Sequence, residues 1–303
     1  MTVPKISLTD DGLTFSRLAW GLWRLADWNI STNEILDRIH TCLDLGITTF
    51  DHADIYGSYQ CEELFGEALA RESALRDKMQ IITKCGIKLV SENRPEHSIN
   101  HYDTTKKHII ASAERSLKNL HTDHIDVLLI HRPDPLMDAD AVAEAFTRLR
   151  SSGKVRYFGV SNFNNRQFKL LASRLDFDLV TNQLELSPVN MGALHDGTLD
   201  FCQQHRINPM IWSPYAGGRL FKDDTRQVQR LQKMMKKIGE EVGGAGIDQI
   251  ALAWILSHPS GAIPIVGTGK TERIKKAVEA LDIELSREQW FNVWRASTGT
   301  EVP

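Results

Sequence analysis

The chain has 303 residues, of which 42% are hydrophobic and 25% charged, and its formal net charge is −3. This is the composition of a globular protein that can bury a large core. Basic residues are scattered, and no apolar run approaches the ~18 residues of a membrane span, which argues against nucleic-acid and membrane partners.

The N-terminus and the cysteines predict where the protein works. Residues 1–5 lack the apolar segment of a signal peptide. The cysteines are widely separated and form no Cys-x-x-Cys motif; they are Cys42, Cys61, Cys85 and Cys202. We therefore expect free thiols in a reducing cytoplasm. No exposed apolar stripe is evident, so we also expect a monomer.

A hairpin is expected at the start of the chain, where two short apolar runs flank Asp11-Gly12. From there, apolar runs alternate with amphipathic segments. The runs that predict strands cover residues 18–20, 46–50, 80–84, 125–130, 155–160, 179–182, 209–212 and 262–266. The segments that predict helices begin near residues 31, 58, 104, 139, 166, 194, 226, 249, 271 and 286.

Helix starts are marked by side chains that can cap a helix. Ser31 with Glu34, and Ser286 with Gln289, have the spacing of a capping box. Ser58 is expected to cap the helix that follows the second barrel strand. These signals place the helix beginnings within the alternating pattern.

Eight strands, each followed by a helix, predict a (β/α)₈ TIM barrel with an N-terminal hairpin and an extra C-terminal helix. We expect one domain over residues 1–303. A doubly wound open sheet is the alternative, but it needs edge strands, and no run has the polar character of an edge.

In a barrel the chemistry lies at the carboxyl ends of the strands. The second strand ends at Asp51 with Tyr56 close behind, the third at Lys84 and the fourth at His131. A nearby ammonium is expected to lower the pKa of a phenol, and an acid beside the ammonium keeps it charged. These four residues therefore predict a proton relay. Each of the four also has a purely structural alternative. Asp51 could cap a turn, Tyr56 could be an aromatic residue at the rim, Lys84 could extend its ammonium to water, and His131 could be a structural hydrogen-bonding residue.

Several segments carry a family resemblance, in order, across nearly the whole chain. They are residues 50–57 (FDHADIYG), 82–84 (ITK), 129–131 (LIH), 159–163 (GVSNF) and 212–214 (WSP). They resemble the aldo-keto reductases, and most of all the bacterial broad-specificity branch of that family. The resemblance implies a cytoplasmic NADP-dependent oxidoreductase of the alcohol dehydrogenase (NADP+) type, which reduces aldehydes or ketones. It also implies that Asp51, Tyr56, Lys84 and His131 are the catalytic residues, with Tyr56 as the proton donor.

The same resemblance implies that NADPH lies across the barrel mouth and that the substrate is a small carbonyl compound. The residues implied to hold the cofactor follow strands five to eight; they are Ser161, Asn162, Gln183, Trp212, Ser213, Leu220, Gly267, Thr268, Lys270 and Arg273. The implied substrate pocket contains Trp23, Tyr56 and His131, and Trp20 and Trp28 are further candidates for its walls.

The chain departs from the family pattern at three places. The usual Thr after the catalytic acid is His52, the frequent Pro-Lys-Ser after the last strand is replaced by Val266-Gly267-Thr268, and an Asn four residues beyond Arg273 is Ala277. Lys270 is expected to supply the positive charge that is missing because Val266-Gly267-Thr268 replaces Pro-Lys-Ser.

Other interpretations explain less of the pattern. Gly269-Lys270-Thr271 resembles the end of a P-loop, but Pro264 stands where the first glycine is required. His52-x-Asp54 has metal-ligand character without enough further histidines, so we expect no metal site. A Schiff-base barrel with Lys84 as nucleophile leaves Asp51 and Tyr56 unexplained. A non-enzymatic NADP-binding sensor or partner-regulating subunit on the same fold stays open as an alternative.

Overall fold

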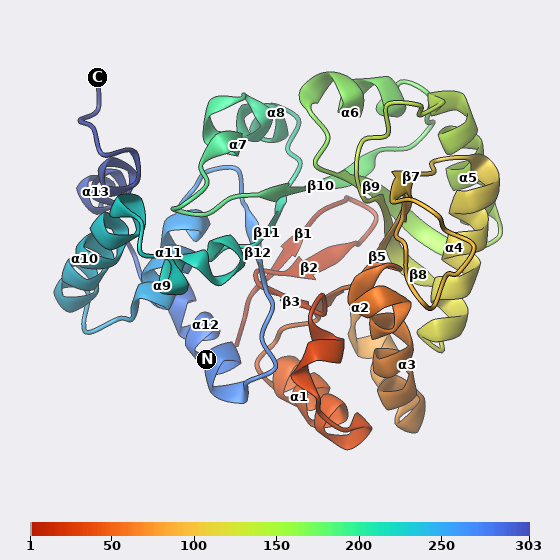
Figure 1. The fold of residues 1–303 in the computed structure, drawn as a ribbon, viewed down its shortest axis with the longest axis horizontal. Helices are drawn as coiled ribbons and strands as arrows, with labels where there is room; N and C mark the ends of the chain where they lie inside the picture. Colours follow the sequence, from red (N-terminus) through yellow and green to blue (C-terminus); the bar gives the residue numbers. More distant parts are fainter. Residues whose placement is uncertain (1) are drawn as a thin grey trace.

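Eight parallel strands close into a barrel in the computed structural model, which describes residues 2–303 (Figure 1). The barrel strands are β3 (Ala19–Gly21), β4 (Thr49–Asp51), β5 (Gln80–Cys85), β8 (Ile125–Ile130), β9 (Val155–Ser161), β10 (Leu179–Glu185), β11 (Met210–Trp212) and β12 (Ile263–Val266). Each pairs in parallel with the next, and β12 pairs with β3 to complete the ring. A closed ring has no edge strand, so the prediction of a (β/α)₈ barrel is confirmed and the open sheet is wrong.

Helices surround the barrel (Figure 1). They are α1 (Thr32–Asp44), α2 (Tyr56–Tyr59), α3 (Cys61–Arg71), α4 (Lys106–Asn119), α5 (Ala139–Ser151), α6 (Asn165–Ala172), α7 (Gly192–His195), α8 (Thr198–Gln204), α9 (Arg219–Lys222), α10 (Arg226–Glu241), α11 (Ile247–Leu256), α12 (Thr271–Glu279) and α13 (Arg287–Thr298). Short 3₁₀ helices occur at Leu25–Trp28, Ser73–Lys78, Ala216–Gly218 and Ala280–Asp282. The extra C-terminal helix of the prediction is α13, which packs against α10.

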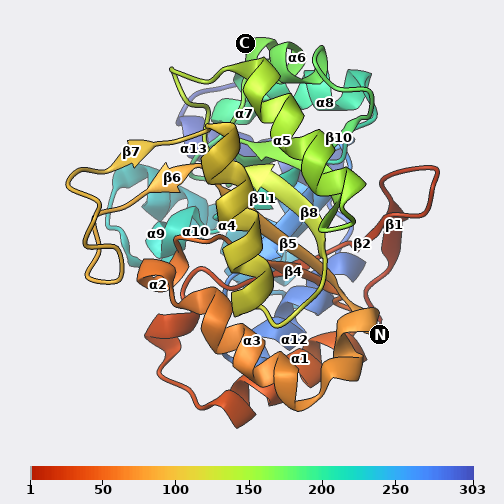
Figure 2. The same ribbon diagram turned by 90° about the vertical axis from the view of Figure 1, so that its right-hand side faces the viewer.

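Two small hairpins lie at opposite ends of the barrel (Figure 2). The first, β1 (Lys5–Ser7) with β2 (Thr14–Ser16), is the hairpin expected from Asp11-Gly12. Its side chains Leu13 and Phe15 pack against the side chains that fill the barrel, and so they plug the end at which the strands begin. The second, β6 (Ile87–Lys88) with β7 (His101–Tyr102), lies within the long 85–103 segment, beside the mouth at which the strands end.

Both predicted capping boxes are present, at Ser31 and at Ser286. The cap predicted at Ser58 is wrong, because Ser58 adopts a left-handed conformation (φ 54°) and α3 begins after Gln60 without a side-chain cap. The helix expected to begin near residue 194 is also interrupted, since Gly197 (φ 78°) separates α7 from α8.

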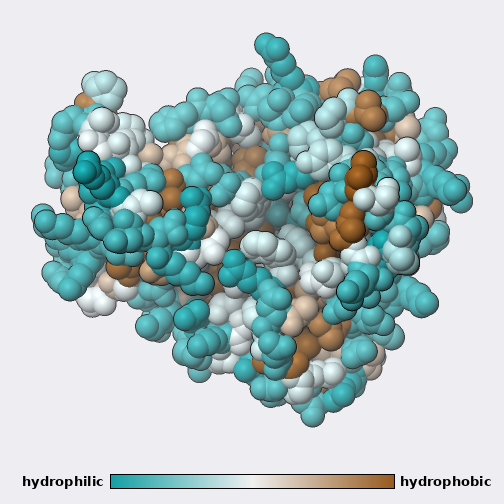
Figure 3. All heavy atoms as spheres, in the orientation of Figure 1, coloured by the Kyte–Doolittle hydropathy of each residue, from teal (hydrophilic) through white to brown (hydrophobic). Residues whose placement is uncertain are grey.

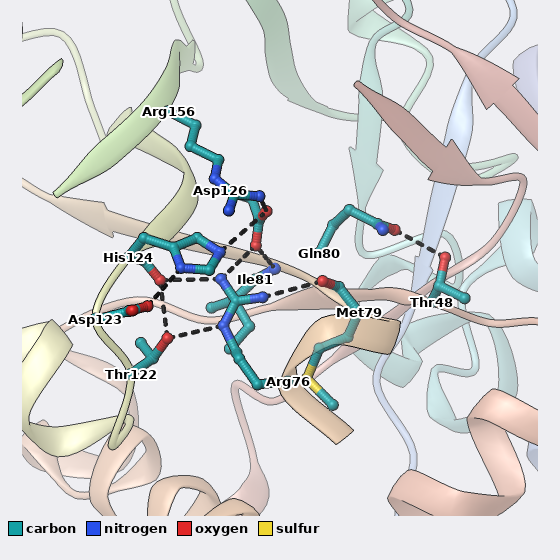
Figure 4. Close-up of polar contacts among 10 residues, drawn as sticks. All are labelled: Thr48, Arg76, Met79, Gln80, Ile81, Thr122, Asp123, His124, Asp126 and Arg156. Carbon is teal, nitrogen blue, oxygen red and sulfur yellow. Dashed lines mark hydrogen bonds and ion pairs between the residues drawn. The ribbon is translucent and has the colours of Figure 1, made fainter. Parts of the chain in front are cut away.

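A buried ion pair ties the beginnings of two barrel strands together (Figure 4). The guanidinium of Arg76 donates to Oδ2 of Asp126 at 2.6 Å, and also to Thr122 Oγ1 at 2.8 Å and to the carbonyl of Met79 at 3.1 Å. The same carboxylate oxygen accepts from the backbone N–H of Ile81 at 2.8 Å. Asp126 therefore connects β8 to β5 at the end of the barrel away from the mouth.

The described part of the chain contains no helix that combines the length and the apolar character needed to cross a bilayer. All four cysteines are buried free thiols.

Candidate active site

Asp51, Lys84 and Tyr56 meet at the carboxyl ends of β4 and β5. Lys84 Nζ donates to both carboxylate oxygens of Asp51, at 2.8 and 2.9 Å, and lies 3.1 Å from the Tyr56 hydroxyl. It also donates to the carbonyl of His52 at 2.6 Å. Because β4 and β5 are neighbours in the ring, residues at their ends are close in space although they are 33 positions apart in the chain.

The ammonium of Lys84 is completely buried. A buried charge is tolerated only when it is paired and hydrogen-bonded, and Lys84 has both kinds of partner. Asp51 gains a further partner from across the barrel, because Gln183 Nε2 in β10 donates to its Oδ1 at 2.8 Å. The chain thus holds one carboxylate, one ammonium and one phenol in a fixed arrangement. The same arrangement leaves Lys84 no free approach for a Schiff-base reaction.

The protonation of Tyr56 differs from the expectation. Burial, followed by the charge of Asp51, raises its pKa well above the usual value of 10.0. The prediction that Lys84 lowers this pKa is therefore wrong for the protein alone, because desolvation of the phenolate outweighs the neighbouring cation. The phenol remains protonated at neutral pH.

His131 follows β8 and faces Tyr56, with ring centroids 5.8 Å apart and ring planes 79° apart. Burial, followed by the charges of Lys84 and Arg132, lowers its pKa well below 6.5. The imidazole is therefore neutral at physiological pH. A neutral ring retains one N–H, which can donate a hydrogen bond without adding a charge.

A left-handed turn presents Tyr56 to the mouth. Gly57, Ser58 and Tyr59 have φ angles of 55°, 54° and 71°. A Cβ atom added to Gly57 would lie 2.5 Å from Cys61 Sγ and 2.8 Å from the Cβ of Ala26, so this position requires glycine. Non-glycine residues in this conformation store strain, which often occurs at functional sites.

A cavity of about 380 Å³ opens between the ends of the strands. It is lined by Asp51, Tyr56 and His131, while Lys84 is buried behind them. Figure 3 shows this face of the molecule, which is hollowed near its centre. Asp51, Tyr56 and His131 therefore face one cavity that is open to solvent.

Six of the ten predicted cofactor residues line the same cavity: Ser161, Asn162, Gln183, Trp212, Ser213 and Gly267. Leu220 has a buried side chain beneath the loop after β11. Thr268, Lys270 and Arg273 lie beyond the cavity wall, and the last two are exposed. The six cavity-lining candidates therefore lie beside the four catalytic candidates, whereas Thr268, Lys270 and Arg273 lie on the adjoining surface.

The predicted substrate residues Trp23, Tyr56 and His131 all line the cavity, and Trp23 is 53% exposed. Trp20 is not part of the wall; it is fully buried and stacks on Trp28 with ring centroids 5.6 Å apart.

Sequence reasoning missed several wall residues, including Arg24, Arg132, Ile87 and Leu89. Arg132 had a signal, since it follows the strand-end residue His131 directly. Ile87 and Leu89 lie in the 85–103 segment, which is held in place where the Tyr59 hydroxyl accepts from the N–H of Leu89 at 2.7 Å.

Comparison with known proteins agrees with this geometry. The model of the Aldo/keto reductase family matches residues 17–296. The chain belongs to the aldo/keto reductase family. It is an oxidoreductase of this family, as the resemblance predicted.

Relatives in this family cover almost the whole chain. Oxidoreductase YdhF of Escherichia coli (strain K12) is 53% identical over 301 residues, covering 99% of this chain and 100% of the relative. The 6-dehydroglucose reductase of Agrobacterium fabrum (strain C58 / ATCC 33970) is 42% identical over 299 residues, covering 98% and 99%. The crystal structure of the thermostable aldo-keto reductase Tm1743 in complex with the inhibitor epalrestat is 26% identical, with a TM-score of 0.81, covering 97% of this chain and 99% of that one.

Two residues of the 50–57 segment, Asp54 and His52, are not among the four catalytic candidates, and both contact buried neighbours. Asp54 is buried and accepts from Ser112 Oγ at 2.6 Å, and burial raises its pKa to about 7. His52 is also buried, with its ring 4.5 Å from that of Phe65. Within residues 2–303, no group of three His, Cys, Asp or Glu side chains is arranged to hold a metal ion.

His52→Leu is expected to raise the free energy of unfolding by about 1 kcal/mol at pH 7.5, because neither buried ring nitrogen has a hydrogen-bond partner among residues 2–303. Burial, followed by the charge of Lys84, lowers the pKa of His52 from 6.5 to about 3. Below pH 6.5 the unfolded chain therefore takes up a proton that the folded chain refuses, and stability falls as the pH falls toward 3.

Urea unfolding of both proteins at pH 7.5 and pH 5 measures this effect. The variant should lose less stability between the two pH values than the wild type. A variant that is clearly less stable at pH 7.5 would mean that the imidazole has a hydrogen-bond partner, such as a buried water.

Proposed function

We propose that this protein is an NADPH-dependent reductase of aldehydes and ketones, with Tyr56 as the proton donor. The observation that carries the proposal is the Asp51–Lys84–Tyr56 arrangement at the wall of a cavity that also contains His131. Two relatives named 6-dehydroglucose reductase, 42% and 35% identical, give support because their name describes a carbonyl reduction.

In the proposed reaction the carbonyl compound gains one hydride at carbon and one proton at oxygen and becomes an alcohol. The nicotinamide cofactor supplies the hydride when it is bound. Tyr56, which is protonated because burial and Asp51 raise its pKa, gives its proton to the oxygen. Lys84, which lies 3.1 Å from the hydroxyl, stabilises the phenolate that remains.

His131 is proposed to stabilise the oxygen as it gains charge. Its imidazole is neutral and lies beside Tyr56, so that one N–H can donate to the substrate oxygen. Asp51 is proposed to hold Lys84 in position and charged through the two hydrogen bonds between them.

The residues at the ends of β9 to β12 fit a nicotinamide cofactor. Trp212 lies in the cavity wall, and its Nε1 donates to Asn162 Oδ1 at 3.0 Å, which fixes its ring for stacking on the nicotinamide. Asn162 Nδ2 donates to Ser161 Oγ at 2.8 Å. We assign Ser161, Asn162 and Gln183 to the carboxamide, where amide and hydroxyl groups can both donate and accept.

The outer part of the cofactor is assigned to two loops. Backbone from Ser213 to Leu220 includes Gly217 and Gly218, both with positive φ, where a phosphate can approach the main chain closely. Gly267, Thr268 and Lys270 lead into α12, whose N-terminus has no side-chain cap. Its uncapped N–H groups favour an anion, and Arg273 adds a positive charge in the first turn.

Arg273→Ser is expected to raise the Kd for NADPH by about 10- to 100-fold and to change the Kd for NADH little, because a charge-assisted bond to the 2′-phosphate is lost. Arg273 is exposed in the first turn of α12, so its guanidinium is accessible to a phosphate. Protein fluorescence titration with both cofactors measures the effect, with Lys275→Ser on the same helix as the control. Equal weakening of both cofactors would contradict the assignment.

The proposed function is tested by titrating the protein with NADPH and then following NADPH oxidation with a panel of carbonyl compounds. Trp23 and Trp212 line the cavity, so cofactor binding should quench tryptophan fluorescence. The panel includes 6-dehydroglucose because of the two relatives with that name. Absence of NADPH binding would overturn the proposal, and binding without reduction of any carbonyl would favour the sensor alternative.

A further inference from the structure

Arg132 is a cation in the cavity wall that the proposed reaction does not use. It follows His131 directly, and its guanidinium carbon lies 5.4 Å from the centroid of the Trp212 ring. Within residues 2–303, Arg132 takes part in no ion pair and its guanidinium donates no hydrogen bond to the protein; its side-chain contact is with the Trp212 ring. An arginine with five unpaired N–H donors at a cavity is poised to bind an acceptor.

The second arginine of the cavity has a different environment. Arg24 donates from Nη2 to the carbonyl of Gly217 at 3.0 Å, and its guanidinium carbon lies 4.8 Å from the Trp23 ring centroid. Arg24 therefore joins two loops of the rim. Arg132 has no comparable structural task.

The positive charge of Arg132 affects the pKa values of the proposed catalytic groups. Its charge is among the causes that lower the pKa of His131, and it opposes the burial that raises the pKa of Tyr56. Apolar side chains in the wall, among them Ile55, Ile87 and Leu89, reduce the polarity of the space that the guanidinium shares with these groups.

We propose that Arg132 binds an oxyanion on the substrate, a carboxylate or a phosphate, so that the site prefers carbonyl compounds that carry a negative charge. A guanidinium matches the planar geometry of a carboxylate or phosphate and forms paired hydrogen bonds with it. Trp212, fixed by its bond to Asn162, stacks with the guanidinium and holds it in position. This inference rests on the proposed function, because it assigns the substrate class of the same site.

The test compares charged and neutral aldehydes of similar shape. One arm uses 4-carboxybenzaldehyde against 4-nitrobenzaldehyde, and the other uses glyceraldehyde 3-phosphate against glyceraldehyde. Arg132→Leu is expected to lower kcat/KM for a charged aldehyde about 10- to 100-fold more than for its neutral partner, mainly through KM. Arg132→Lys should recover part of the loss, since it restores the charge without the planar fork. Arg226→Leu, which removes an exposed positive charge outside the cavity, is the control for net charge.

The outcomes separate the inference from the proposed function. A selective loss of kcat/KM for 4-carboxybenzaldehyde shows that Arg132 binds a carboxylate, and a selective loss for glyceraldehyde 3-phosphate shows that it binds a phosphate. Selective losses for both show that it binds oxyanions in general. Each of these results supports the inference. Equal loss for charged and neutral aldehydes, or a matching loss of NADPH affinity in Arg132→Leu, overturns it and leaves the proposed function standing. If the wild-type protein binds NADPH but reduces none of the four aldehydes or the wider panel, the proposed function fails as well.

Discussion

Replacing Tyr56 with phenylalanine is expected to lower kcat for carbonyl reduction by about 10²- to 10⁴-fold while NADPH binds as before. The substitution removes one oxygen atom, which is the proposed proton donor and which lies 3.1 Å from Lys84 Nζ. The aromatic ring that lines the cavity remains. Steady-state kinetics with a reducible aldehyde measure the loss, and fluorescence titration with NADPH shows that the cofactor site is intact.

Tyr157→Phe is the matched control for this variant. The Tyr157 hydroxyl bonds to Asp11 Oδ1 at 3.0 Å, near the hairpin that closes the other end of the barrel. The Tyr157→Phe variant should therefore reduce aldehydes at the wild-type rate. A Tyr56→Phe protein that binds NADPH and reduces aldehydes near the wild-type rate would show that the proton comes from another group.

The order of strands along the chain was enough to predict which catalytic candidates meet. Asp51 and Lys84 end consecutive strands of a parallel barrel, and such strands are neighbours whose carboxyl ends lie at the same edge. Their contact therefore follows from counting strands. The contact between Gln183 and Asp51 does not, because it crosses the barrel between β10 and β4, and it depends on side-chain length and direction.

Properties that depend on surroundings were less predictable. The presence of Lys84 suggested a lowered pKa for Tyr56, whereas burial and Asp51 raise it. The residue types show which charges are near, but the degree of desolvation requires the packed structure. Ser58 shows the same limit, since its residue type favours a helix cap while the turn after Tyr56 places it in a left-handed conformation.

Arg132 could have been found from its position next to a strand-end histidine, but its significance could not. Arginines are usually exposed or paired, and an unpaired one in a cavity wall is recognised only when its surroundings are known. The sequence also gave no sign of the Arg76–Asp126 pair. These residues are 50 positions apart and lie near the beginnings of the barrel strands, away from the carboxyl ends that carry the catalytic residues of a barrel.

Asp126→Ala is expected to lower the free energy of unfolding by about 3 to 5 kcal/mol, because it leaves the guanidinium of Arg76 buried without its counter-charge. The substitution also removes the acceptor for the N–H of Ile81 (Figure 4). Urea unfolding followed by circular dichroism measures the change. Activity of the folded variant should persist in dilute buffer, because the pair lies at the end of the barrel away from the cavity.

Two further variants distinguish a lost ion pair from lost packing. Asp123→Ala removes a 93% exposed carboxylate that contacts His124, and it should leave the unfolding transition unchanged. Arg76→Met combined with Asp126→Leu removes both charges and refills the space with apolar atoms, so it should be much less harmful than Asp126→Ala alone. If the double variant is as unstable as the single one, the carboxylate acts through its bond to the Ile81 N–H, and the ion pair contributes little to the joining of β5 and β8.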